Sequence, residues 1–134
     1  MNSNSKIVQG SLRFAVTALV DQLPRMRSTD IYTGQLLRAA TSVAANYRAV
    51  CRARSSADMV SKLGIVEEEA DETSFWLGML VDARKAGSEV CAPLIREADE
   101  IVAMTVASIK TLRRRINPKS KIQNPKSCDS TRDS

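Results

Sequence analysis

The feature of this sequence that most restricts its fold is an unbroken apolar repeat between residues 59 and 80. Its members alternate steps of four and three residues, which is the heptad spacing of a helix that packs against other helices. They are Met59, Leu63, Val66, Ala70, Thr73, Leu77 and Leu80. With Ser55 as N-cap and Gly87 as a left-handed stop, the spacing predicts a helix over about residues 56–86.

Weaker patterns of the same kind predict three further helices, over about residues 6–23, 30–53 and 89–115. Pro24 ends the first of them, and Ser28, Thr29 or Asp30 would cap the second. Short links make consecutive helices antiparallel neighbours, so residues 1–116 are predicted to form one all-α domain, an antiparallel up-down four-helix bundle. The expected inward face of the second helix is Ile31, Leu37, Ala40, Ala44, Tyr47 and Cys51. That of the last helix is Leu94, Ala98, Ile101, Thr105, Ser108 and Leu112.

The composition agrees with packed helices and argues against most kinds of enzyme. Hydrophobic residues make up 43% of the 134 residues and aromatic residues only 4%, so the core must be mainly aliphatic, which favours helices over a β-sandwich. The chain has no histidine, and this removes the commonest general base and zinc ligand. We therefore expect a protein that is not an enzyme and uses no cofactor or metal.

The cysteines and the apolar stretches bear on where the protein works. Cys51, Cys91 and Cys128 are odd in number and far apart, which argues against a disulfide framework and fits a reducing compartment. No stretch reaches the roughly 18 apolar residues that a membrane span needs, and the first ten residues lack a signal-peptide pattern. The expected location is cytoplasmic, without membrane contact.

Positive charge is concentrated in two clusters. Arg48, Arg52 and Arg54 lie near the end of the second predicted helix, and Lys110 with Arg113, Arg114 and Arg115 lies near the end of the fourth. The first cluster is either a phosphate-binding ridge or a solvated helix end. The second is weaker evidence, because cations are favourable at any helix C-terminus. Both clusters are candidates for nucleic-acid binding.

The third predicted helix carries more apolar surface than one packing seam needs. Phe75 falls outside the seam, and Trp76 and Met79 widen it, which suggests a second contact surface. Gly64, Asp71 and Gly78 follow one another at seven-residue spacing, and this stripe would admit another backbone closely. Either the two aromatic residues, Met79 and the two glycines form an interface between copies of the chain, or the tryptophan and glycines pack beneath the first helix of the same chain.

Polar residues on the helices have structural interpretations. Glu68 and Glu72, one turn apart, could hold a metal, but without histidine they are better explained as partners of Arg38, Arg48 or Arg52 on a neighbouring helix. Ser42 and Asn46 lie on a mostly apolar helix and are expected to be hydrogen-bonded at a packing contact.

Residues 117–134 differ in character from the rest of the chain. They repeat Asn-Pro-Lys-Ser and are of low complexity, so a disordered polar tail is expected there. This tail is either a frayed extension or a cationic arm that adds nonspecific affinity.

Residues 35–80 resemble a known family, the four-helix-bundle proteins encoded in intervening sequences of bacterial 23S rRNA genes. The resemblance rests on Arg38-Ala39-Ala40, Ser42, Asn46, Ser55, Leu63 and Glu72 in register, and with weaker similarity it covers about residues 6–116. It departs at residues 49–54, where many members read Glu-Gly-x-Gly-Arg-Gly, and at Asp58-Met59, where they read Glu-Phe. No role of the missing glutamate transfers to this chain.

The resemblance implies a homopentameric ring and leaves the biochemical activity open. Similar proteins include accessory proteins of diversity-generating retroelements, which look like adaptors that hold a reverse transcriptase and nucleic acid on a basic surface. The matching positions for such a surface are Arg38, Arg48, Arg52 and Arg54. The sequence thus favours an oligomeric, non-enzymatic bundle that binds structured RNA or DNA. The alternative is a protein-interaction scaffold, for example for a reverse transcriptase, with no direct nucleic-acid role.

Overall fold

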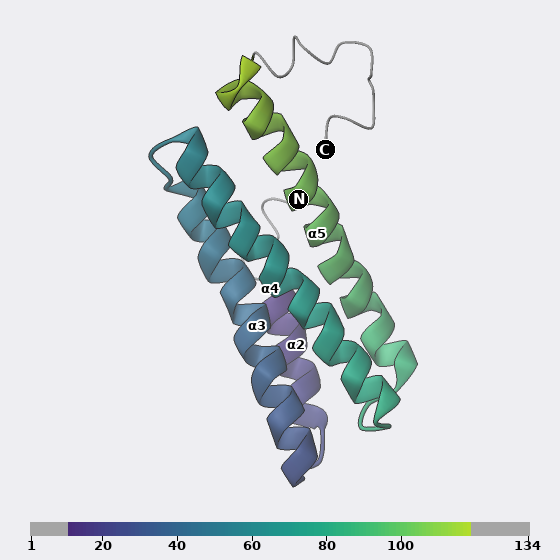
Figure 1. Cartoon of the computed structure of the whole chain (residues 1–134). Helices are drawn as coiled ribbons and strands as arrows, with labels where there is room; N and C mark the ends of the chain where they lie inside the picture. Colours follow the sequence, from purple (N-terminus) through teal and green to yellow (C-terminus); the bar gives the residue numbers. More distant parts are fainter. Residues whose placement is uncertain (1–10, 119–134) are drawn as a thin grey trace.

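The computed structural model describes residues 11–118, and within this range the chain forms four helices (Figure 1). They are α2 (Ser11–Gln22), α3 (Arg27–Cys51), α4 (Ser56–Asp82) and α5 (Ser88–Ile116). Consecutive helices run in opposite directions, so the predicted all-α, up-down arrangement is confirmed. The expected tail over residues 119–134 and the expected first turn of helix at residues 6–10 lie outside the described residues.

Helix α4 is the centre of the packing, in contact with both α3 and α5 along most of its length. Six of the seven residues of its predicted seam are buried: Leu63, Val66, Ala70, Thr73, Leu77 and Leu80. Ser55 caps the helix as expected, because its hydroxyl accepts a hydrogen bond of 3.1 Å from the backbone nitrogen of Asp58. Burial of four large aliphatic side chains on one stripe fixes the side of α4 that faces its neighbours.

Helix α3 differs from its prediction in both its start and its inward face. It begins at Arg27 after an extended Met26, whereas the sequence places its start near residue 30. Asp30 lies inside the first turn, where its carboxylate is paired with Arg25 at 2.9 Å. Ile31 is 58% exposed and Cys51 is also exposed, so both were placed wrongly on the inward face, and Leu36 and Val43 take core positions instead. Thr33 can be buried because its hydroxyl donates to the Thr29 carbonyl at 2.8 Å.

The connection between α4 and α5 also differs from its prediction. The helix ends at Asp82, and Arg84 rather than Gly87 takes the left-handed conformation, with φ of 59°. The Lys85 nitrogen donates to the Leu80 carbonyl at 2.8 Å, and the Arg84 nitrogen donates to the Val81 carbonyl at 3.0 Å. These two bonds form a Schellman motif with a non-glycine residue at its left-handed position. Gly87 has φ of −76° and precedes α5 as its N-cap.

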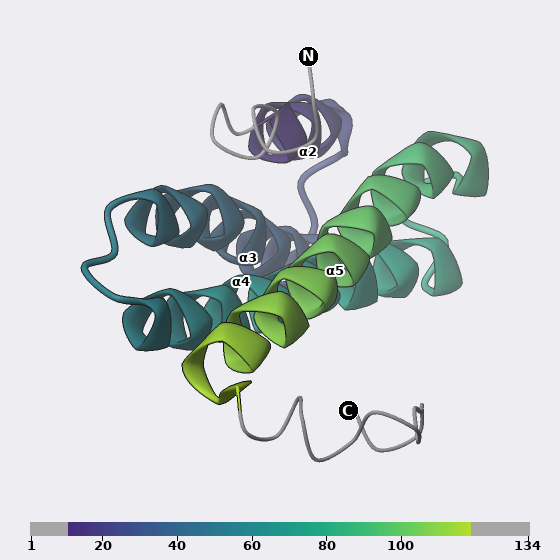
Figure 2. The same cartoon turned by 90° about the horizontal axis from the view of Figure 1, so that it is seen from above.

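Helix α2 is much shorter than the other three and covers only part of the bundle. It packs against α3 and, less extensively, against α5, and its buried residues are Leu12, Val16 and Leu19. Seen from above, α2 lies over the space between α3 and α5, on the side of the layer away from α4 (Figure 2). Figure 1 places it alongside the half of the bundle that is distant from the α3–α4 turn. The other half therefore lacks this fourth helix within residues 11–118.

Candidate nucleic-acid interface

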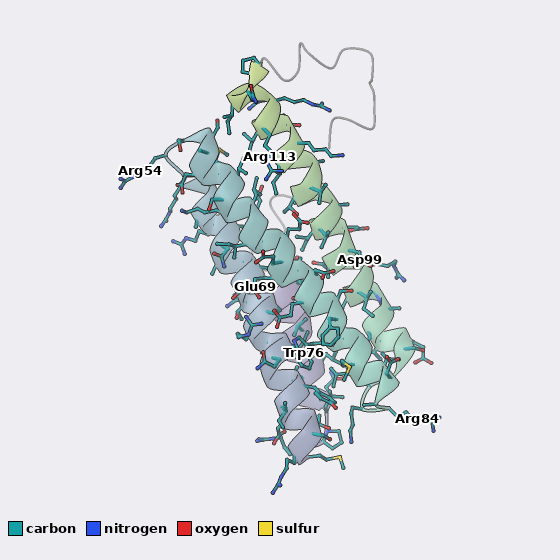
Figure 3. All side chains as sticks on the ribbon, viewed as in Figure 1. Arg54, Glu69, Trp76, Arg84, Asp99 and Arg113 are labelled. Carbon is teal, nitrogen blue, oxygen red and sulfur yellow. The ribbon has the colours of Figure 1, made fainter. Side chains whose placement is uncertain are left out.

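The fold brings the two basic clusters to the same end of the bundle. Helices α3 and α5 run in the same direction, so the C-terminal end of α3, the α3–α4 turn and the C-terminal end of α5 lie together (Figure 1). Arg54 and Arg113, one from each cluster, both lie at this end, whereas Arg84 lies at the other (Figure 3). The exposed cluster members are Arg48, Arg52, Arg54, Lys110, Arg113, Arg114 and Arg115. We call this part of the surface the basic end.

Acidic residues are nearly absent from the stretches that form the basic end. Residues 48–62 and 104–118 contain eight lysines and arginines and one acid, Asp58. That carboxylate accepts a bond of 2.8 Å from Lys62, and this bond holds the pKa of Asp58 below its usual value. With eight bases and one acid, these stretches give the basic end a large excess of positive charge, which suits a surface that receives phosphates.

Arg38 occupies a different position from the other candidate arginines. It lies midway along α3 and is paired with two carboxylates of α4, Glu69 at 3.1 Å and Glu72. These bonds raise the pKa of Arg38, with Glu72 the stronger cause. Its charge already has two partners, so we do not include it in the phosphate-binding surface proposed below.

Glu72 connects the ion pair to the aromatic residues of α4. Its carboxylate accepts a bond of 3.1 Å from the Trp76 indole nitrogen, which with Arg38 lowers the pKa of Glu72. The interpretation of Glu72 as the partner of an arginine on a neighbouring helix agrees with this geometry, whereas Glu68 is exposed. Across the described residues, no cluster of three or more acidic or cysteine side chains is arranged to hold a metal ion.

The candidate contact surface on α4 contains one strongly exposed ring. Phe75 is 55% exposed and packs edge-on against Trp76 with 5.0 Å between ring centroids. Trp76 is half-buried and contacts Tyr32 of α3 at 5.9 Å between centroids. Phe75 and Met79 border a shallow depression along the outer side of α4, together with Gly78. Phe75 therefore remains on the surface, while Trp76 contributes to the α3–α4 contact.

The glycines of α4 do not pack beneath another helix of the same chain. Among residues 11–118, a Cβ atom added to Gly64 or Gly78 would meet no atom within 4 Å outside the backbone of its own helix. The suggestion that these glycines admit the first helix closely is therefore wrong for this chain. Their surfaces are open, as an approach by a second molecule would require.

The two polar residues singled out on α3 are half-buried. The Asn46 side-chain nitrogen donates to the Ser42 backbone carbonyl at 2.9 Å, so this amide is satisfied within its own helix. This arrangement supports a structural role for Asn46. Within residues 11–118, no helix is both long enough and apolar enough to cross a membrane.

Sequence reasoning did not predict that the two clusters form one surface, although a signal for it was present. In an up-down bundle, the second and fourth helices run in parallel, so basic residues at both C-termini meet at one end. Sequence reasoning also missed an apolar groove beside this end, which is lined by Tyr47, Val50, Met59, Leu63, Met104, Ala107, Ser108, Thr111, Leu112 and Arg115. No sequence pattern predicts this groove, because the groove depends on the position of α2 along the bundle.

The helix order and the up-down packing place the chain in the class of all-α four-helix proteins. Within that class, residues 3–107 match the family described as 23S rRNA-intervening sequence protein, and the chain belongs to this family. A solved structure from Bacteroides thetaiotaomicron VPI-5482, a protein with unknown function from the S23 ribosomal protein family, is 31% identical to this chain with a TM-score of 0.69. The match covers 78% of this chain and 98% of that one. The comparison with curated proteins found no match.

Proposed function

We propose that this protein is a non-enzymatic, oligomeric bundle that binds structured RNA or DNA through phosphates at its basic end. The observation that supports this proposal is the meeting of two arginine clusters at one end of the fold, where Asp58 is the one acid among residues 48–62 and 104–118. No aromatic residue is interleaved with the cluster over residues 110–115, which favours contact with phosphates over base recognition. The expected binding is strong at low salt and has low sequence specificity.

Self-association would increase this affinity. A closed cyclic ring, with five copies expected from the family resemblance, can present the same end of every protomer on one face. The exposed Phe75 and the open surfaces of Gly64 and Gly78 support an interface on the outer side of α4. Each additional protomer adds its own arginines to the contact with one nucleic acid, so affinity rises through multivalency.

The nucleic-acid proposal is tested by fluorescence anisotropy with a labelled RNA hairpin and a labelled DNA duplex in a salt titration. Each phosphate contact contributes about 0.9 to the slope of log K against log salt for duplex DNA. The double variant Arg48→Ala/Arg52→Ala should reduce this slope by about two for every protomer that contacts the DNA. The matched control is Arg27→Ala/Arg96→Ala, which removes two exposed arginines away from the basic end.

The control variant has the same net charge as the test variant, so it separates local contacts from general attraction. We expect its slope to remain near that of the unaltered protein. Equal slopes for the two double variants would reject the basic end as the binding surface. Absence of binding to either probe at about 50 mM salt would reject the nucleic-acid function itself.

The proposed oligomer is tested by light scattering coupled to gel filtration. Gly78→Leu adds a side chain in open space on the isolated fold, so it should leave helix content intact while blocking close approach of a second copy. Gly34→Leu on α3 is the control, because a Cβ there also meets nothing within 4 Å. A reduced mass for Gly78→Leu alone would support the α4 interface. An unchanged mass would place any interface elsewhere.

A second candidate function is a protein-interaction scaffold, for example one that holds a reverse transcriptase. The exposed Phe75 next to Trp76 favours it, because large aromatic side chains are enriched at protein interfaces. If both nucleic-acid probes fail to bind and Gly78→Leu leaves the mass unchanged, this candidate becomes the leading one. Binding partners would then be sought on the α4 surface with Phe75→Ser as the disrupting variant.

A further inference from the structure

The apolar groove beside the basic end is the open continuation of the slot that α2 fills. The first turn of α2 lies against Val43 of α3 and Ile101 of α5, and Ser11 donates a 3.0 Å bond to Glu97 of α5. The groove begins one turn further along both helices. It is lined there by Tyr47 and Val50 of α3 and by Met104 and Ser108 of α5. The groove is therefore roughly in line with α2.

The size and lining of the groove match a helix. Its volume is about 410 Å³, and its α5 wall extends from Met104 to Arg115, a distance of about 16 Å at 1.5 Å per residue. The buried Val50, Leu63 and Leu112 form its floor. Three turns of a helix fit this length, and the neighbouring α2 demonstrates that a helix packs in this slot.

The chemistry at the edge of the groove selects one kind of helix. Arg115 lines the groove, and Arg48 is exposed on α3 at the same end of the bundle. None of the lining residues is acidic. A helix with an apolar face and acidic flanks would bury its apolar face against the floor of the groove. Its acidic side chains would then pair with the arginines. Met59 and Met104 in the walls can adjust to side chains of different shape.

We infer that this groove binds an acidic amphipathic helix of a partner protein. The ten residues before Ser11, MNSNSKIVQG, have the wrong charge for this occupant, because they contain Lys6 and no acid. Nucleic acid needs the arginines but not an apolar floor with the length of three helical turns. This consequence rests on the proposed function: a helix bound here would occupy arginines proposed to contact phosphates, so the partner and nucleic acid would compete for the basic end.

The probe is a fluorescein-labelled designed peptide of about 16 residues, with leucines along one helical face and glutamates on its flanks. A second peptide of the same composition has its leucines distributed around the helix. Anisotropy with the full chain should give saturable binding of the amphipathic peptide below about 100 µM and at least about tenfold weaker binding of the scrambled peptide. Similar affinities for the two peptides would overturn the inference, because charge alone would then explain the binding. No saturation up to that concentration would also overturn it.

Two glutamate variants localise the bound peptide. Ala107 and Ala103 are exposed alanines one turn apart on α5, and only Ala107 lines the groove. Ala107→Glu should weaken amphipathic-peptide binding about tenfold through repulsion and blocked contact, whereas Ala103→Glu should change it less than about twofold. Circular dichroism melts establish that both variants are folded. Equal losses in the two variants would overturn the inference.

One further variant examines the occupants that the inference rejects. If deletion of residues 1–10 is required before the peptide binds, the chain's own segment occupies the groove and the inference is overturned. If light scattering shows that the peptide dissociates an oligomer, a second copy occupies the groove, with the same consequence. Displacement of the RNA hairpin by the amphipathic peptide, with the oligomer intact, supports the inference.

Discussion

The two ends of this bundle are built from the same helices but differ in completeness. At the end away from the α3–α4 turn, α2 covers α3 and α5, and the core residues Val16, Leu77 and Leu80 are fully buried. At the basic end, no fourth helix lies over the slot within residues 11–118, and Tyr47 and Met104 are only half-buried. The comparison shows that the tightly packed core and the surface suited to binding lie at opposite ends of the bundle. One end is packed, and the other combines apolar surface with positive charge.

The largest predicted effect compares truncations in the two ends. Leu77→Ala removes a side chain that is 0% exposed, and it should lower the free energy of unfolding by about 2–5 kcal/mol because a cavity remains. Leu112 borders the groove, so Leu112→Ala encloses no new cavity. The free energy of unfolding should therefore fall by roughly half as much. Urea denaturation followed by circular dichroism measures both. Equal losses would show that the basic end is packed as tightly as the other.

The next effect concerns the α3–α4 turn at the basic end. Ser55→Ala removes the hydroxyl that accepts from the Asp58 nitrogen, which should cost about 1 kcal/mol in the same denaturation experiment. Ser55→Asp keeps an acceptor at the N-cap and should recover most of the loss. A loss with alanine that aspartate does not restore would exclude capping as its cause.

A smaller gain is expected at the opposite end. Arg84 has a left-handed φ of 59°, which costs a residue with a side chain about 1–2 kcal/mol, so Arg84→Gly relieves this strain. Glycine is also more flexible in the unfolded chain, and the net gain should be about 0.5 kcal/mol. Arg84→Ala removes the charge but keeps the strain, so it is the control. If alanine stabilises as much as glycine, the backbone conformation is not the reason.

The smallest predicted effect concerns the ion pair of Arg38 and Glu72, which lies midway along the bundle. The Trp76 indole and the Arg38 guanidinium lower the pKa of Glu72, so they stabilise the fold above the pKa that Glu72 has when unfolded. This contribution is lost as the pH falls through the lower folded-state pKa. Glu72→Gln should cost at most about 0.5 kcal/mol near neutral pH, since both partners are partly exposed.

The pH dependence of this cost is the check. The difference between Glu72→Gln and the unaltered protein should shrink once the pH falls below the usual pKa of a glutamate, near 4.5. Denaturation at a series of pH values would measure it. A difference that is constant across that range would mean that the carboxylate charge contributes nothing.

How much of the fold the sequence could predict depended on side-chain size. In α4, the seam keeps its steps of four and three from Leu63 to Leu80, with large aliphatic residues at both ends, so its inward face was predicted correctly. In α3, several alanines leave the period ambiguous, and Thr29 and Thr33 occupy core positions that a hydrophobic pattern cannot reveal. The ends of helices were less certain, because the stop depends on which residue accepts a left-handed φ.

Some parts of the candidate site could be predicted from the sequence and others could not. The arginines of both clusters could be chosen from sequence, and the pairing of Glu72 with an arginine of a neighbouring helix could be anticipated. The groove could not, because its existence depends on the position of α2 along the slot rather than on any local pattern. The exposure of Gly64 and Gly78 also required the structure, since small residues at regular spacing fit both an internal and an external contact.

The shortness of α2 has a consequence for how the molecule opens. Its 12 residues touch α3 and α5, whereas α4 holds both of those helices along most of their length. Detaching α2 therefore breaks fewer contacts than unfolding the whole domain, and we expect α2 to open as a separate, less stable cooperative unit. Amide hydrogens of α2 should exchange with solvent before those of α4. In the detached state, the slot between α3 and α5 is open from one end of the bundle to the other.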